Sequence, residues 1–190
     1  QGETQADAMV AEAIKLMQEG LRLKKQGSKE SLLAARKKLE AALVLWEKLG
    51  NKPLQALTLL LISRIYVDLG ENQKALKYYN QALPLYSEAG HKDGEATTFN
   101  NIGKVYSNFG EKQKALQFYN QALPLFRAVG NSYMEAVTLN NIGKVYWDLG
   151  DKHKALQYLN QSLPLRRAVK SKNGEAITLN NIGQVYSDSG

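Results

Sequence analysis

The chain has 190 residues, of which 44% are apolar and 23% charged, with four prolines and no cysteine; this composition excludes collagen-like, disordered and disulfide-stapled chains. No window approaches the roughly 18 uninterrupted apolar residues of a membrane helix, so we expect no membrane partner. The formal net charge of +7 is spread along the chain and mixed with acidic residues, whereas nucleic-acid readers gather basic residues into a stripe or tail, so we expect no nucleic-acid partner.

The predicted elements follow one another as copies of a 40-residue unit. Residues 96–135 and 136–175 are identical at 24 of 40 positions, and the same interval separates Tyr66, Tyr106, Tyr146 and Tyr186. A fixed period of this size indicates stacked units that bury their apolar faces against their neighbours. We therefore expect one array over residues 1–190, with a divergent unit at 1–50, regular units at 51–90, 91–130 and 131–170, and the first helix of a truncated unit at 171–190.

The first unit departs most from the pattern. Gly20, Leu23, Gly27, Ala35 and Ala42 fit it only with three extra residues after Gly27. Its basic stretch at residues 36–38 lies beside acidic residues, and we interpret it as a solvated helix face.

The unit at residues 51–90 begins with Pro53 in a first helical turn after Asn51. On its first helix Leu57, Leu60 and Leu61 stand where later units carry polar residues. Either these leucines form an apolar pocket for a partner side chain, or the N-terminal helices fold over them. We favour the second, because an uncovered apolar patch promotes aggregation.

The unit at residues 91–130 reads as two helices. Phe99, Ile102, Gly103 and Tyr106 share one face of the first, which Gly110 ends and which Asp93 is expected to cap. A second helix is expected from about residue 112 toward residue 130, with an inner face of Ala115, Leu116, Tyr119, Ala122 and Leu123. Ser132 and Glu135 then predict a capping box for the next helix.

A proline falls inside the second helix of each regular unit, at Pro84, Pro124 and Pro164. Proline frees the carbonyl four residues earlier, so we expect this helix to be bent and extended instead of terminated.

The recurring residues resemble the tetratricopeptide repeat. Its pattern is met by Phe99, Ile102, Gly103, Tyr106, Ala115 and Tyr119, and again by Leu139, Ile142, Gly143, Tyr146, Ala155 and Leu159. The period exceeds the family's usual length of about 34 residues. Long units containing Leu-Asn-Asn-Ile-Gly are similar to those of kinesin light chains and of bacterial, especially cyanobacterial, arrays. The resemblance implies an all-α, right-handed α-solenoid, or superhelix, of antiparallel helix-turn-helix units.

The resemblance also implies a protein-protein interaction scaffold that binds a peptide or partner-protein segment in the concave groove lined by the first helices. We expect that surface to hold Asn100, Asn101, Lys104, Asn140, Asn141, Lys144, Trp147, Asn180, Asn181 and Gln184. The asparagine amide offers both donors and an acceptor to a peptide backbone. Two alternatives remain: one asparagine of each pair bridges neighbouring units, and Trp147 packs against a neighbouring helix instead of serving as a binding hot spot.

No catalytic motif is present, so we expect no enzyme activity, no cofactor and no metal site; His91 and His153 read as surface residues. Two other functions stay open. The array is alternatively a structural assembly module that forms homo-oligomers through its open terminal helix, since Gly190 aligns with the turn residue Gly150. RNA binding is less favoured, because it needs stacking aromatics and only Trp147 qualifies. A cytoplasmic location is favoured, and a secreted one applies if a signal peptide preceded Gln1.

Overall fold

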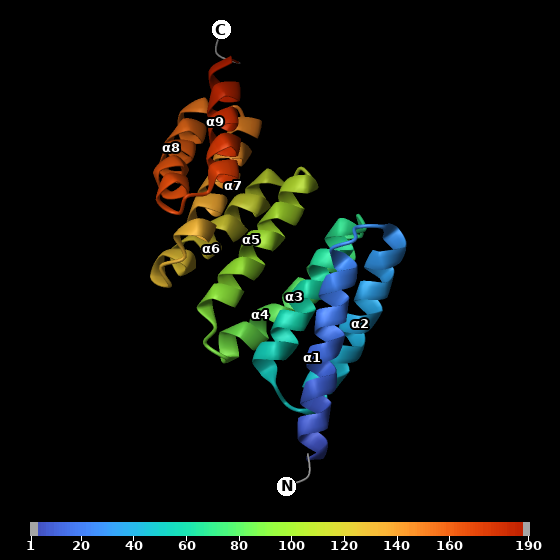
Figure 1. The fold of residues 1–190 in the computed structure, drawn as a ribbon. Coiled ribbons are helices and arrows are strands. Elements are labelled where there is room, and N and C mark those ends of the chain that lie inside the picture. The colour runs from blue at the N-terminus through green and yellow to red at the C-terminus, as the bar shows by residue number, and fades with distance from the viewer. Residues whose placement is uncertain (1–3, 188–190) are drawn as a thin grey trace. The chain divides into compact units, whose positions relative to one another are not determined.

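The computed structural model describes residues 4–187, which form nine α-helices and no strand (Figure 1). The helices are α1 (Gln5–Lys24), α2 (Lys29–Lys48), α3 (Lys52–Asp68), α4 (Asn72–Glu88), α5 (Lys92–Asn108), α6 (Lys112–Ala128), α7 (Ser132–Asp148), α8 (Lys152–Ala168) and α9 (Lys172–Ser187). The predicted all-α class of helical hairpins is confirmed. Gln1 and Gly190, on which two expectations rest, lie outside the described residues. Within the described part, no helix combines the length and apolarity needed to cross a bilayer.

The helices pack into two compact units, Gln1–Gly94 and Glu95–Gly190. In the first unit α1 packs on α2, α2 on α3, and α3 on α4. Gly20 lets α1 and α2 approach closely, because a Cβ atom there would lie 3.0 Å from Leu39 Cγ and 3.3 Å from the Ala35 carbonyl oxygen. Gly20 and Ala35 therefore lie at the close approach, as the expected alignment of the divergent first unit requires. The bounds of that unit stay a prediction.

The leucine face of α3 is largely covered. Leu60 and Leu61 are 5% and 7% exposed, whereas Leu57 is 37% exposed. Met17 of α1 reaches the same helix, with its sulfur 3.6 Å from Thr58 Oγ1. Met17 of the N-terminal helices thus contacts α3, and Leu57 is the exposed member of the three leucines. The covering of Leu60 and Leu61 by the N-terminal helices stays a prediction.

In the second unit α6 packs on α7, α7 on α8, and α8 on α9. The predicted inner face of α6 is confirmed, since Ala115, Leu116, Tyr119, Ala122 and Leu123 are all buried. The predicted close approach at Gly103 is also confirmed, because a Cβ atom there would lie 2.8 Å from the Tyr119 ring and 3.2 Å from the Ala115 carbonyl oxygen.

Two of the three predicted helix starts are wrong by one or two residues. Asn131, not Ser132, caps α7, and its side chain accepts a hydrogen bond from Met134 N at 3.1 Å. Ser132 is already helical, and Glu135 pairs with Arg127 at 2.7 Å instead of closing a capping box.

Helix α5 begins at Lys92, so Asp93 lies inside its first turn. The cap bond comes from His91, whose Nδ1 accepts from Gly94 N at 3.0 Å. In both places a residue that stands before the predicted cap supplies the acceptor. The third start is confirmed, since Asn51 caps α3 and Pro53 lies in its first turn.

The prolines do not end the second helices. Helices α4, α6 and α8 continue beyond Pro84, Pro124 and Pro164 to Glu88, Ala128 and Ala168. The expected extension is confirmed, and the expected bend stays a prediction.

Candidate functional site

The first helices of the second unit, α5, α7 and α9, carry the predicted binding residues. The buried ones are Asn100 and Asn140, at 4% and 7% exposed. Asn101, Asn141, Asn181 and Trp147 are half-buried, while Lys104, Lys144, Asn180 and Gln184 are exposed. The members of each asparagine pair therefore occupy different environments in α5 and α7.

Asn100 joins two successive first helices. Its Oδ1 accepts hydrogen bonds from Thr138 Oγ1 at 3.1 Å and from Asn141 Nδ2 at 3.4 Å. Thr138 and Asn141 stand one turn apart on α7, so a single carbonyl of α5 receives both donors.

The same arrangement recurs 40 residues later. Asn140 Oδ1 accepts from Thr178 Oγ1 at 3.2 Å and from Asn181 Nδ2 at 3.0 Å. The first asparagine of a pair thus bridges neighbouring units, which is the alternative that the sequence left open. The second asparagine uses one amide hydrogen in that bridge and keeps its own Oδ1 without a protein donor among residues 4–187.

Two cations accompany these oxygens on α5 and α7. Lys104 and Lys144 are exposed, and within the described residues neither forms an ion pair. This face therefore includes amide oxygens, which accept hydrogen bonds, and ammonium groups, which attract carboxylates.

Trp147 on α7 contributes to the core. It packs against a cluster formed by Ala155, Leu159 and Val185 while staying half-buried. Packing against neighbouring helices is thus observed, and the part of the ring that stays accessible is what a partner could contact.

A recurring set of lysine and tyrosine side chains that the motifs did not predict lies where the first helix of a unit ends and the second begins. Lysine ammonium groups lie 5.7, 5.3 and 5.1 Å from the ring centroids of Tyr66, Tyr106 and Tyr146, in the pairs Lys74–Tyr66, Lys114–Tyr106 and Lys154–Tyr146. Each lysine also pairs with the acidic residue three positions before it, Glu71, Glu111 or Asp151. The signal was available, because a lysine follows each tyrosine by eight residues in all three units.

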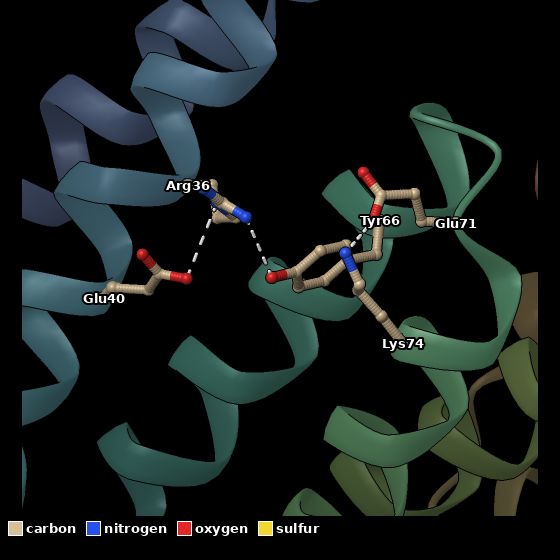
Figure 2. A network of polar contacts seen from close by, with 5 residues as sticks. All are labelled: Arg36, Glu40, Tyr66, Glu71 and Lys74. Atoms are coloured by element: carbon tan, nitrogen blue, oxygen red, sulfur yellow. Dashed lines mark hydrogen bonds and ion pairs between the residues drawn. The ribbon is translucent and has the colours of Figure 1, made fainter.

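The set is largest at Tyr66, where Arg36 joins it from α2 (Figure 2). Arg36 Nη1 donates to Tyr66 Oη at 3.0 Å, and Arg36 Nε lies 3.6 Å from Glu40 Oε1. Lys74 approaches the same ring from α4. Arg36 is half-buried, so the expected solvated face does not hold at this residue, because its long side chain lies along an aromatic ring.

The electrostatics of this cluster follow from those contacts. The hydrogen bond to Tyr66 raises the pKa of Arg36. Burial raises the pKa of Tyr78, whose ring stacks on Tyr66 with centroids 5.2 Å apart. Arg36 therefore stays charged and Tyr78 neutral at physiological pH.

Groups that could support metal or acid-base chemistry are dispersed. Across residues 4–187, no three His, Asp or Glu side chains gather where they could hold a metal ion. His91 and His153 are both exposed, as the sequence predicts, and His91 lies beside the Tyr86 ring at a centroid distance of 5.5 Å.

The tetratricopeptide repeat family model matches the chain at residues 28–88, 73–128, 95–168 and 134–190. Comparison with curated proteins gives no match. Among solved structures, the chain is similar to BtubC (BKLC) from P. vanneervenii, with a TM-score of 0.68 and 20% identity over 98% of this chain and 85% of that one.

A Podosopora anserina putative kinesin light chain with nearly identical TPR-like repeats has a TM-score of 0.72 and 13% identity, covering 92% of this chain and 87% of that one. The apo form of RapI has a TM-score of 0.82 and 17% identity over 93% of this chain and 68% of that one. These likenesses show a shared helical-repeat fold, so the predicted α-solenoid class is confirmed.

Proposed function

Because the chain belongs to the tetratricopeptide repeat family, we propose that it is a protein-protein interaction scaffold whose face of α5, α7 and α9 binds a peptide segment of a partner protein. The observation that carries the proposal is that the two asparagines of a pair make different hydrogen bonds. On α5 and α7 the amide oxygen of the first asparagine is used between the helices. The amide oxygens of Asn141 and Asn181 are left as acceptors on the same surface.

Preorganisation is the proposed mechanism. The bond from Asn141 Nδ2 to Asn100, and that from Asn181 Nδ2 to Asn140, fix the orientation of the outer amides before a partner arrives. An arriving segment then bears most of the ordering cost, because the receiving side chains already hold one rotamer.

The chemistry of the face suggests the kind of segment. Amide oxygens at Asn101, Asn141 and Asn181 suit backbone N–H donors, which every peptide carries whatever its side chains. Lys104 and Lys144 suit acidic side chains. We therefore propose an acidic peptide segment, with Trp147 and Gln184 at the margin of its contact surface.

The test is direct binding of selected peptides. Peptides from a random display library are selected on the immobilised full chain, and their affinities are then measured for variants by fluorescence anisotropy. Changing Asn141 and Asn181 together to Ala should lower affinity at least tenfold, and changing Lys104 and Lys144 to Ala should weaken acidic peptides most.

The matched control lies on the second helices. Asn120 and Asn160 are also exposed asparagines repeated at 40 residues, and their change to Ala should leave affinity within twofold. Equal losses in the control, or no loss in the α7 and α9 variant, would refute the proposed face.

A second candidate function is assembly of copies through α9. It is favoured by exposed apolar side chains on that helix, with Ile177 47%, Leu179 44% and Tyr186 60% exposed. Mass measurement by light scattering across a hundredfold range of concentration tests it. A dimer that Ile177→Lys and Leu179→Lys convert to monomer supports assembly, and a monomer at every concentration excludes it.

A further inference from the structure

A cation takes the place of an aromatic residue in one hydrophobic position of the array. Arg166, in the last turn of α8, is only 6% exposed. At intervals of 40 residues before it stand Trp46, Tyr86 and Phe126, all buried. The fold therefore accepts a large apolar ring at this position, and only the last copy buries a guanidinium there.

The buried guanidinium has no acidic partner among the described residues. Its Nε makes no hydrogen bond. The two carboxylates nearest in sequence are engaged elsewhere, because Glu175 pairs with Arg167 at 2.7 Å and Asp151 pairs with Lys154 at 3.1 Å. A buried charge without a hydrogen-bonded counter-charge is costly, so its retention needs an explanation.

Two features of the protein offset part of that cost. The guanidinium lies over the Tyr133 ring of α7, 5.4 Å from its centroid. Its place in the last turn of α8 also puts it near the negative end of that helix dipole. Neither provides an acceptor for Nε–H, since a ring face and a helix dipole are not lone pairs aimed at that donor.

Arg166 points at the first turn of α9, a helix of 16 residues. A Cβ atom added to Gly174 would lie 2.8 Å from Arg166 Nη1 and 2.7 Å from Ser171 Oγ, so the guanidinium and the hydroxyl meet over Gly174. The N-terminal turn of a helix carries positive partial charge and free N–H groups, and a cation placed there is repelled unless an anion lies between them.

The N–H groups of this turn also differ from those of α3, α5 and α7. In those helices a side chain accepts from the N–H of the third helical residue: Asn51 from Leu54, His91 from Gly94 and Asn131 from Met134. Within residues 4–187 the corresponding N–H of Gly174 has no side-chain acceptor, and Ser171 Oγ makes no hydrogen bond. A guanidinium, a hydroxyl and an uncapped helix N-terminus thus present donors to one place.

We propose that Arg166, Ser171 and the first turn of α9 form an oxyanion-binding site, suited to a phosphate or carboxylate group, with Tyr133 as one wall. The anion would supply the acceptor that Nε lacks and the negative charge that the helix N-terminus favours. Gly174 lets the guanidinium lie against the first turn of α9, because any side chain there would meet it. This site is separate from the asparagine face and does not depend on the proposed peptide binding.

The experiment is a titration of the full chain, labelled with 15N, by inorganic phosphate or by acetate, with sodium chloride holding the ionic strength constant. We expect phosphate, acetate or both to shift the Gly174 amide and the Arg166 Nε–Hε signals along saturable curves. Saturation by acetate assigns carboxylate chemistry to the site, and saturation by phosphate alone assigns phosphate chemistry. The Gly94 amide is the internal control, because Tyr86 occupies the equivalent place beside it.

The matched variant is Arg166→Tyr, which copies the Tyr86–Gly94 pair. It should weaken binding at least tenfold, whereas Arg167→Ala, which removes a neighbouring surface charge, should change it less than threefold. Arg166→Met serves if the tyrosine variant does not fold. The proposal is overturned if neither anion saturates, if the shifts persist without Arg166, or if Arg167→Ala removes them equally, since that result would mean general charge screening.

Discussion

The close approach of α7 and α8 at Gly143 gives a prediction with an internal control. In Gly143→Ala the new Cβ would lie 2.7 Å from Leu159 Cγ and 3.1 Å from the Ala155 carbonyl oxygen. The side chain can rotate, but the backbone carbonyl cannot move without shifting α8. The equivalent glycine of α9, Gly183, has no atom within 4 Å of the same added Cβ.

The two substitutions therefore differ only in what the methyl group meets. Alanine is better than glycine in a helix by about 1 kcal/mol. Overpacking a fitted contact costs about 1–3 kcal/mol. Gly143→Ala should thus lower the free energy of unfolding by up to about 2 kcal/mol, whereas Gly183→Ala should raise it by about 0.5–1 kcal/mol.

The assay is urea unfolding of the full chain followed by circular dichroism and by tryptophan fluorescence. Trp147 packs on the cluster that contains Leu159, so its emission reports on the contact that Gly143→Ala disturbs. The midpoint should move to lower urea for Gly143→Ala and not for Gly183→Ala. A midpoint that moves equally in both variants would refute the argument from close approach, because propensity alone would then account for the changes.

Three further predictions concern polar groups. Asn140→Ala removes the acceptor of the hydrogen bonds from Thr178 and Asn181 and should lower the free energy of unfolding by about 1–2 kcal/mol in urea titration. Asn160→Ala, at an exposed position, should lower it by less than about 0.5 kcal/mol, and equal effects would contradict a stabilising bridge between α7 and α9. Burial raises the pKa of Tyr86 to about 12, so the folded state favours the neutral phenol, and stability should fall as pH rises above the ordinary tyrosine pKa of about 10. Burial also raises the pKa of Tyr79 and Tyr119, so Tyr86→Phe should make the fall of the melting temperature between pH 10 and 12 less steep without abolishing it, and an unchanged slope would refute this. Tyr66→Phe removes the acceptor of Arg36 and should cost about 1 kcal/mol by thermal unfolding, while an unaltered stability would assign that contact no net value.

The 40-residue period and the helical spacing of apolar residues were enough to predict the hairpins and the contact of Gly103 with the following helix. These features depend on local periodicity, which sequence displays directly. The first residue of each helix was harder to predict, because neighbouring residues compete to cap the same N–H groups. Asn131 and His91 accept the cap hydrogen bonds, instead of Ser132 and Asp93, which the spacing predicts.

The environments of Asn100 and Asn101 could not be separated from sequence. Helical geometry places both away from the Phe99 face, yet which of them is buried depends on where α7, some 40 residues later, packs. Arg36 and Arg166 illustrate a second limit. Arg36 lies in a mixed-charge stretch and resembles a solvated residue, and only the position of the Tyr66 ring on another helix shows otherwise. The 40-residue alignment places Arg166 where earlier units carry an aromatic residue, but its contact with Tyr133 depends on how α7 and α8 pack.

The hydrogen bonds of Asn100 and Asn140 would allow a whole repeat to be removed or added. Both asparagines receive donors from a threonine 38 residues later and an asparagine 41 residues later, so the same chemical pairing is written twice. Excising residues 131–170 would therefore bring Thr178 and Asn181 to Asn100 and set Phe126 beside Gly174, an aromatic-glycine pair of the kind seen at Tyr86 and Gly94. A gene encoding such units can gain or lose one 40-residue unit in a single recombination event. The units that then become neighbours still carry matching contact residues, so the length of the array can change without new substitutions between units.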